Sequence, residues 1–401
     1  MAGGPQKGFG NYLMIWSPWI EEPIKRRFLN GAAVAFQKKT GVRIEIFWMQ
    51  KNVLQKNLVV NWGRKKPKPD ISYIDPSFRH RHIGNALLDL KTLSLPQNKD
   101  PYWNLGDAGG RTNNYLPIEG HGRAIFYNKP LFEKAGIRLP KGRLLNSDEF
   151  LEIIKKLRHN NITPIAEGAA NREWKAAIPI VNTMIRYAGH DKMHQLIQRE
   201  INFSDPDIIR SLKYWKKIID AGGYDCSKSL RLGLSDGILE MIEGRAAISF
   251  CDTWIYSTFG AAGAARSKYG RVGVLDWFNV PDGKGNNTFD YTLDAGYGVN
   301  RYSPSVELAK QYLQYLITPH AAKLWTRHVQ SPYPISLPNW PADSFYGELA
   351  AQRRNQKQMK GIGYLFLPTP ALNNMWSNVT KEFICGRISV DDFVRRMNSR
   401  F

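Results

Sequence analysis

One Gly-x-Ser-x-Gly motif is the first pattern in this sequence whose residue types and spacing could do chemistry. Gly233 to Gly237 has the spacing of a hydrolase nucleophile elbow, in which a serine sits between a strand and a helix. Here a segment rich in Ser, Arg and Leu precedes the motif, and Ser235 is placed to cap the helix that follows. The sequence therefore disfavours a serine nucleophile.

Acidic pairs and histidines are the other candidates for catalysis or metal binding. Asp290 and Asp294 could serve a glycosidase, which needs two carboxylates beside the scissile bond, but no neighbouring motif supports this role. His80 and His82 alternate with Arg79 and Arg81, and the neighbouring cations disfavour a metal. No phosphate-binding loop or HExxH motif occurs. We expect no catalytic residue, no cofactor and no metal.

Aromatic residues at the ends of predicted strands and helices give a stronger signal. They are Trp16, Trp19, Trp48, Phe78, Trp174, Trp254, Tyr297, Tyr333 and Trp376. Ligands of open α/β sheets bind beyond the carboxyl ends of the strands. Aromatic faces there suit the C–H face of a sugar ring, while polar neighbours bind its hydroxyls. Any single Trp fits a core position equally well, so the inference rests on the set.

The elements that must position these residues alternate along the chain. We predict strands at 12–16, 42–48, 69–74, 123–127, 246–250, 272–275 and 295–299. Helices are predicted at 24–39, 53–62, 147–159, 174–187, 205–221, 234–243, 305–316, 372–383 and 390–397, with mixed structure at 340–359. Alternation of this kind predicts doubly wound, mostly parallel sheets. Gly120 and Gly122 predict a bend before the strand at 123–127.

Length and composition limit the class of protein. A chain of 401 residues suits two domains, and since it has no obvious linker, we expect it to cross between them more than once. No apolar run approaches the roughly 20 residues that span a bilayer. Met1 to Gly10 lack the apolar region of a secretory signal, and residues 1–7 are expected to be a leader or disordered. Cys226, Cys251 and Cys385 are expected to be buried free thiols.

The charge balance is strongly basic, with 56 Lys and Arg against 35 Asp and Glu, a net charge of +21. Between Lys25 and Lys68 there are twelve basic residues and one acidic residue, Glu45. Such a segment attracts a nucleic acid, an acidic polysaccharide or an anionic membrane, or it is a solvated basic surface. We favour the solvated surface.

Five segments resemble one known family in its own order. They are 120–136, 244–254, 294–300 with 307–313, 370–376 and 386–392. Together they extend from residue 120 to residue 392 and make the chain similar to the family 1 extracellular solute-binding proteins, the maltose-binding type of ABC importer receptor.

The resemblance implies a two-lobed, type II periplasmic binding protein-like α/β fold with several hinge crossings. The implied lobes are residues 8–120 with 295–331 and residues 121–294 with 332–401. A ligand would bind in the cleft between them, and the lobes would close on it about the hinge. Trp254 and Trp376 match stacking aromatics, and His121 stands where maltose binders have an acid.

Ligand contacts are expected beyond the first strand, at the crossings and on the later helices. The candidates are Trp16, Ser17, Trp19, Gln50, Asp75, Ser77, Phe78, Glu119, His121, Arg123, Asn171, Glu173, Trp174, Asp252, Trp254, Asp294, Tyr297, Tyr333 and Trp376.

The function that follows is an ABC-importer receptor for a carbohydrate, favoured as an oligosaccharide. We expect a monomer in the periplasm or anchored at the cell surface, with permease subunits and no nucleic acid as partners. The alternative ligand is anionic, such as an acidic oligosaccharide or a glycerol phosphate, with Arg123, Arg172 and Lys175 as its candidate contacts. A glycosidase and a nucleic-acid-binding protein are less favoured alternatives.

Overall fold

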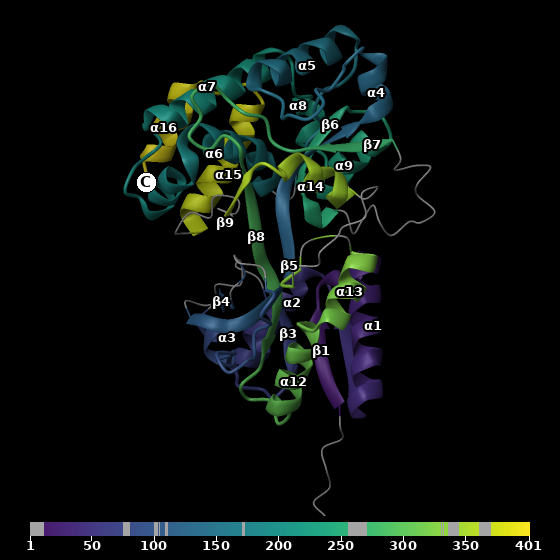
Figure 1. The fold of residues 1–401 in the computed structure, drawn as a ribbon. Helices are drawn as coiled ribbons and strands as arrows, with labels where there is room; N and C mark the ends of the chain where they lie inside the picture. The colour runs from purple at the N-terminus through teal and green to yellow at the C-terminus, as the bar shows by residue number, and fades with distance from the viewer. Residues whose placement is uncertain are drawn as a thin grey trace, which may run out of the picture. The chain divides into compact units, whose positions relative to one another are not determined.

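A computed structural model gives the fold as two compact units (Figure 1). It describes residues 12–74, 81–99, 103, 105–108, 111–170, 173–255, 271–329, 331, 333–335, 345–360 and 370–401. Unit 1 comprises Met1–His121, Trp254–Gly263 and Thr292–Pro341, and unit 2 comprises Gly122–Thr253, Ala264–Tyr291 and Ala342–Phe401. The chain therefore changes unit inside two long strands, β5 (Arg111–Asn128) and β8 (Thr288–Val299).

Unit 1 is an α/β unit with a mixed sheet. Its strands are β1 (Tyr12–Ser17), β2 (Arg43–Trp48), β3 (Ile71–Ile74), β4 (Gly106–Ala108), the first part of β5 and the last part of β8. Its helices are the 3-10 turn η1 (Trp19–Glu21), α1 (Pro23–Thr40), α2 (Lys51–Gly63), α3 (Arg81–Ala86), α12 (Val306–Leu316) and α13 (Pro319–His328). The strand order is β2-β1-β3-β8-β5-β4.

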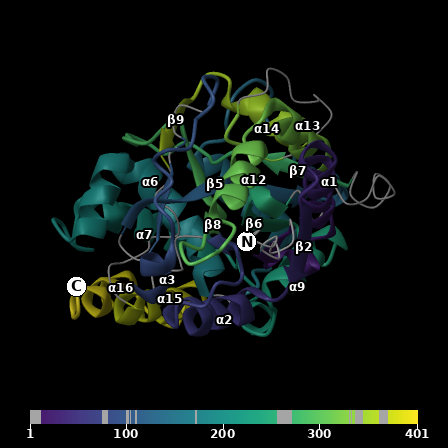
Figure 2. The same cartoon turned by 90° about the horizontal axis from the view of Figure 1, so that it is seen from below.

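Local sequence explains the first elements of unit 1. Leu13, Ile15 and Ser17 alternate with partly exposed residues along β1, and α1 buries an apolar stripe that includes Phe28 and Phe36. A glycine with φ of +74°, Gly41, follows α1 and ends it. Figure 2 shows α1 and α2 on either side of β2.

Unit 2 is rich in helices. They are α4 (Lys129–Lys134), α5 (Ser147–His159), α6 (Glu173–Gln198), α7 (Pro206–Asp220), α8 (Cys226–Ser229), α9 (Leu234–Ile242), α14 (Phe345–Arg353), α15 (Pro370–Ile384) and α16 (Val390–Asn398). Its strands are parts of β5 and β8 with β6 (Ile248–Asp252), β7 (Val272–Leu275) and β9 (Lys357–Lys360). The 3-10 turn η2 (Thr253–Ile255) continues β6 across the boundary of the units.

Capping chemistry sets helix ends in unit 2. The Asn146 side chain accepts a hydrogen bond from the Glu149 backbone N–H, and the Glu149 carboxylate accepts one from the Asn146 backbone, so a capping box begins α5. A non-helical residue, Gly189 at φ 78°, interrupts α6 and divides it into two helical parts. In α9 the cap is Gly233, whose N–H donates to the Asp236 carboxylate at 3.0 Å, and not Ser235 as expected.

The two-unit α/β architecture was predicted, but strand directions are more mixed than expected. β1 is parallel to β2 and β3, and β8 is parallel to β9. β3 with β8, and β5 with β4, β6 and β7, are antiparallel pairs. The expected bend at Gly120 and Gly122 is replaced by continuous strand, because β5 runs through both glycines.

Close packing accounts for Gly122. A Cβ added there would lie 2.7 Å from the Asp290 carbonyl oxygen and 2.9 Å from Arg353 Nη1, closer than real Cβ contacts. Glycine at this position allows β8 to approach β5, which is a packing role and not a turning one.

The prediction of three buried free thiols is wrong for two of the three cysteines. Cys226, which opens α8, and Cys385, which follows α15, form a disulfide across 159 residues, and only Cys251 is a buried free thiol. Both ends of the disulfide lie in unit 2. The spacing along the chain gave no sign of this pair because the fold alone brings the two segments together.

Candidate functional site

Several predicted site residues of unit 1 surround one buried lysine, Lys25 on α1. We name Lys25, Glu22, Glu119, Trp19 and Trp254 the Lys25 cluster. The ammonium group forms ion pairs with Glu22, at 2.5 Å, and with Glu119 of β5. It lies 5.6 Å from the ring centre of Trp19 and 5.7 Å from that of Trp254. The cluster thus joins α1, η1, β5 and η2.

Electrostatics keep Lys25 charged although its side chain is only 2% exposed. Burial alone lowers the pKa of Lys25, but the negative charges of Glu119 and Glu22 outweigh it and raise the pKa. The neighbouring Tyr73 hydroxyl donates to the Glu119 carboxylate at 3.3 Å. A cation held this way can orient the aromatic rings beside it through cation–π attraction.

The aromatic residues of this region differ in exposure. Trp19 and Tyr297 are fully buried, and their rings pack edge to face with centres 5.6 Å apart. The Ser17 and Tyr297 hydroxyls share a hydrogen bond of 2.9 Å. Trp254 is half-buried, as is Trp16 at the end of β1. Of these four rings, Trp16 and Trp254 alone keep surface that a ligand could cover.

Two further candidates of unit 1 lie apart from the cluster. Gln50 is exposed before α2 and donates to the Glu21 carboxylate at 3.3 Å. Tyr333 is buried, its hydroxyl donates to the Leu316 carbonyl, and its ring packs 5.2 Å from Trp325. Tyr333 therefore packs in the core of unit 1.

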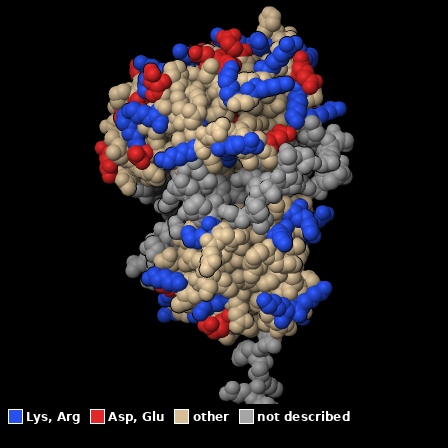
Figure 3. Space-filling model, viewed as in Figure 1, with Lys and Arg blue, Asp and Glu red and all other residues tan. Residues whose placement is uncertain are grey.

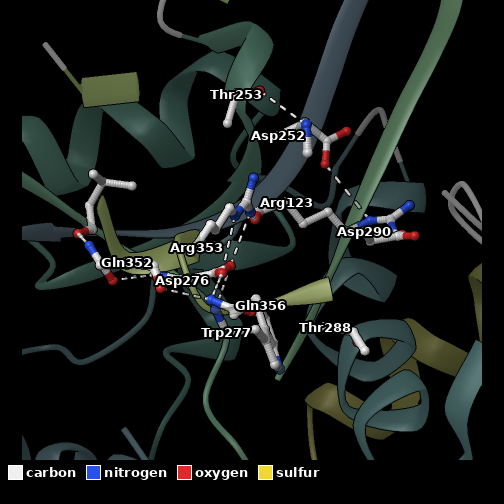
Figure 4. Close-up of polar contacts among 12 residues, drawn as sticks. Arg123, Asp252, Thr253, Asp276, Trp277, Thr288, Asp290, Gln352, Arg353 and Gln356 are labelled. Carbon is white, nitrogen blue, oxygen red and sulfur yellow. Dashed lines mark hydrogen bonds and ion pairs between the residues drawn. The ribbon is translucent and has the colours of Figure 1, made fainter. Parts of the chain in front are cut away.

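Arg123 and Asp252 of unit 2 belong to a buried group of charges (Figure 4). We name Arg123, Asp252, Asp290, Asp276 and Arg353 the Arg123 cluster. Arg123 on β5 forms an ion pair with Asp290 on β8 and lies 3.8 Å from the Asp252 carboxylate on β6. Opposite charge therefore links three strands at the positions where the chain changes unit.

The second half of the Arg123 cluster fixes α14. Arg353, at the end of that helix, donates from Nε to Asp276 Oδ2 at 3.1 Å and from Nη2 to Oδ1 at 3.0 Å. The Nη2 atom also donates to the Arg123 carbonyl at 2.7 Å. Burial alone raises the pKa of Asp276, but the charge and hydrogen bonds of Arg353, together with the charge of Arg186, outweigh it and lower the pKa.

Arg186 and His190 of α6 extend this group. Arg186 donates to three carbonyls of the 277–285 loop, those of Trp277 at 3.0 Å, Phe278 at 3.0 Å and Gly285 at 2.7 Å. Burial lowers the pKa of Arg186 to about 10, so the side chain is still charged at neutral pH. His190 Nε2 lies 3.4 Å from Asp290, and burial with the charge of Arg186 lowers the pKa of His190 to about 4.

A small cavity lies among these side chains of unit 2. Its lining includes Arg123, Arg186, Asp276 and Asp290, and it has room for about one water molecule. A sugar ring does not fit there. The Arg123 cluster is thus a structural charge network, in which the Arg123 and Asp252 side chains are buried against partners.

Trp376, expected to stack on a ligand, is a core residue of unit 2. The side chain on α15 is 2% exposed, with ring centres 5.8 Å from Phe203 and 5.7 Å from Phe393. Protein neighbours thus cover almost all of the indole surface. The helical periodicity that marked α15 also explains why this residue points inward.

The remaining candidates have no described side chains. Asp75, Ser77, Phe78 and Asn171, with Arg172 and His80, lie outside the described residues. For His121, Glu173, Trp174, Asp294, His82, Lys175 and Ser235 the structure describes the backbone element alone. Among the described residues, no group of three His, Cys, Asp or Glu side chains could hold a metal ion. No described helix has the length and apolar character of a membrane span.

Sequence reasoning missed Lys25, Tyr73, Arg186, His190, Asp276 and Arg353. One signal was available for Lys25. It stands on the apolar stripe of α1, four residues before Leu29 and seven before Ala32, where a buried charge implies a partner.

Comparison with known proteins decides the family. The family model of the bacterial extracellular solute-binding proteins matches residues 17–323. The chain belongs to this family. An uncharacterized ABC transporter extracellular-binding protein of Pyrococcus horikoshii is 27% identical over 154 residues, 38% of this chain and 34% of that relative. The match spans about a third of the relative's length.

Solved structures agree with this solute-binding protein fold. A chitin oligosaccharide binding protein superposes with a TM-score of 0.81 at 19% identity, covering 97% of both chains. The solute-binding protein RafE in complex with raffinose gives 0.74 at 16% identity, over 97% of this chain and 98% of that one. At such identities the likeness establishes the fold, which the sequence had predicted.

Proposed function

We propose that this solute-binding protein is the receptor of an ABC importer, that it binds an oligosaccharide between its two units, and that the ligand leaves chemically unchanged. The observation that carries the proposal is Trp254. It is the first residue of unit 1 after the chain leaves unit 2, it is half-buried, and its ring lies beside the Lys25 ammonium. A half-exposed indole at a crossing suits stacking on a sugar ring.

Closure about the crossings would couple binding to transport. A ligand that touches both units favours the closed form by its differential affinity for that form. The closed receptor would then be recognised by the membrane permease, outside the cell or in the periplasm. The two similar structures bind chitin oligosaccharides and raffinose, which supports a carbohydrate.

The anionic-ligand alternative loses one of its three candidate contacts. Arg123 is buried and paired with Asp290, so its charge is already balanced within unit 2. The glycosidase alternative is weakened in the same way, because the Asp290 carboxylate is engaged by Arg123. We therefore favour a neutral oligosaccharide that is bound and released.

A thermal-shift screen followed by calorimetry tests the proposal. The panel comprises chitin oligosaccharides, raffinose, maltodextrins, acidic oligosaccharides and glycerol phosphate. We expect a neutral oligosaccharide to raise the melting temperature, because it binds the native state alone. Calorimetry should give a micromolar Kd, which corresponds to a binding free energy of about −8 kcal/mol.

Chromatography after long incubation supplies the control for catalysis. An intact sugar is expected. Hydrolysis would contradict the receptor role, and a response to glycerol phosphate alone would contradict the choice of ligand.

A further inference from the structure

Unit 1 carries all of its excess positive charge in one continuous segment. From Lys25 to Lys68 there are twelve Lys and Arg and one acidic residue, whereas the rest of unit 1 has ten basic and ten acidic residues. This segment forms α1, β2 and α2. On the face drawn in Figure 3, Lys and Arg side chains gather over α1 and α13 with few acids among them.

Helix α2 presents two opposite stripes. Leu54, Leu58 and Trp62 point into the core and are 0%, 0% and 1% exposed. The outer stripe contains Val53, Lys56 and Val60, spaced by three and four residues and so on one face of the helix. Val53 is 43% and Val60 49% exposed, and Lys56 is exposed between them. The outer face thus mixes apolar and cationic side chains.

Three more basic residues follow directly after the helix. Arg64, Lys65 and Lys66 are exposed after α2. From Ile46 to Pro69 the sequence has six basic residues and no acid. Within the described part of the chain, no carboxylate lies in ion-pair range of Lys56, Arg64, Lys65 or Lys66. We name Val53, Lys56, Val60, Arg64, Lys65 and Lys66 the α2 face.

We propose that the α2 face binds the surface of a bilayer that contains anionic phospholipids. Their headgroups neutralise the four cations, and the boundary of the acyl chains accepts the two valines between them. Duplex DNA or an acidic polysaccharide would satisfy the charges but would offer no apolar layer to Val53 and Val60. This proposal rests on the proposed function in one respect, because a receptor that serves a permease works beside a membrane.

Vesicle co-sedimentation of the full chain tests this directly. The vesicles contain equal parts of phosphatidylglycerol and phosphatidylcholine, with pure phosphatidylcholine as the neutral reference. We expect binding to the anionic vesicles alone, weakening as salt rises. A basic residue near an anionic surface contributes about a fivefold change in partition. The triple variant Lys56→Gln, Arg64→Gln, Lys66→Gln should therefore bind about a hundredfold more weakly.

A matched control separates the α2 face from net charge. Lys156→Gln, Lys213→Gln and Lys217→Gln remove the same charge from exposed positions of α5 and α7 in unit 2. This variant should bind vesicles like the parent chain. Equal losses in both triple variants would overturn the proposal, as would unchanged binding of the α2 variant.

The valines distinguish a bilayer from a soluble polyanion. Asn has a helix propensity close to that of Val, so Val53→Asn with Val60→Asn should leave α2 folded, as circular dichroism would check. We expect about tenfold weaker vesicle binding and unchanged binding to heparin or duplex DNA. Loss of vesicle binding for the charge variant, with no effect of the valines and equal affinity for heparin, would reject the bilayer as the partner.

Calorimetry with the sugar on the same samples separates this inference from the proposed function. A chain that binds sugar but not vesicles refutes the α2 face alone. A chain that binds vesicles through the α2 face but binds no sugar supports the α2 face and refutes the proposed function.

Discussion

Each unit buries charged side chains, but the two groups differ in what surrounds them. In the Lys25 cluster one cation lies between two carboxylates and two indoles, and the Trp254 indole keeps exposed surface. In the Arg123 cluster two arginines face three aspartates across β5, β6, β8 and α14, and the remaining space fits about one water.

This difference separates a surface for recognition from a network for positioning. Burying an ion pair is a weak source of stability, but removing one partner leaves a costly unpaired charge. The sealed Arg123 cluster should therefore affect folding when it is broken. The partly open Lys25 cluster should affect ligand binding through the ring of Trp254.

Breaking the Arg123 cluster should give the largest effect. Arg353→Met leaves Asp276 buried without its main cation, and we expect the free energy of unfolding to fall by about 3–5 kcal/mol in urea titrations. Arg395→Met is the matched control, since Arg395 is 72% exposed beside Asp392 and should contribute far less. A stability equal to that of the parent chain would show that Arg353 is no structural partner.

Breaking the disulfide should act on unit 2 alone. Cys226→Ser with Cys385→Ser removes the link across 159 residues and should lower the free energy of unfolding by about 2–4 kcal/mol. All three cysteines lie in unit 2. Hydrogen exchange should therefore quicken in unit 2 and not in unit 1. Faster exchange in both units would contradict this separation.

The periodic elements could be predicted from the sequence because local patterns determine them. The stripe of α1, the cap at Asn146 and the strand at 272–275 all follow from neighbours within a few residues. What could not be predicted depends on distant segments. The Cys226–Cys385 pair and the antiparallel partners of β5 form only when segments far apart in sequence meet.

The candidate site was predictable by region and less so by residue. Position after a strand brought Ser17 and Trp254 to attention, and position at a crossing brought Glu119, and the structure brings all three near Lys25 or its neighbours. Position at the start of a helix, together with the family resemblance, also selected Trp376, because an aromatic residue there looks alike in sequence whether it faces a core or a ligand. Burial decides between these roles, and burial depends on the whole fold.

Replacing Trp254 should weaken sugar binding without unfolding the chain. Trp254→Ala removes a half-buried ring, and we expect a loss of about 1–3 kcal/mol in affinity, on the scale known for aromatic stacking. Trp376→Ala is the contrasting variant, since a buried Trp should cost about 3–5 kcal/mol of stability. Calorimetry on folded Trp376→Ala protein should find an affinity for the sugar equal to that of the parent chain. Lost stability in Trp254→Ala together with lost sugar affinity in Trp376→Ala would show that the roles given to the two tryptophans are wrong.

The smallest effect per step is expected from pH, acting through His190. Its pKa is lowered from 6.5 to about 4 in the folded chain, because burial and the charge of Arg186 disfavour the protonated ring. The unfolded chain therefore binds a proton first as pH falls, so this contribution to stability is complete above pH 6.5 and is lost between pH 6.5 and about 4. The slope should be about 1 kcal/mol per pH unit.

Urea titrations of the parent chain and of His190→Gln across this pH window check the prediction. The free energy of unfolding should depend less steeply on pH in His190→Gln. His159→Gln changes an exposed histidine of α5 and should leave the slope as it was. The contribution of a carboxylate with a lowered pKa, such as Glu149, whose pKa falls from 4.5 to about 2, is lost only from the acid end of the window downward, and equally in the parent chain and in His190→Gln. An equal slope in parent and His190→Gln would mean that the imidazole is hydrated, and that the Arg123 cluster is more open than its burial implies.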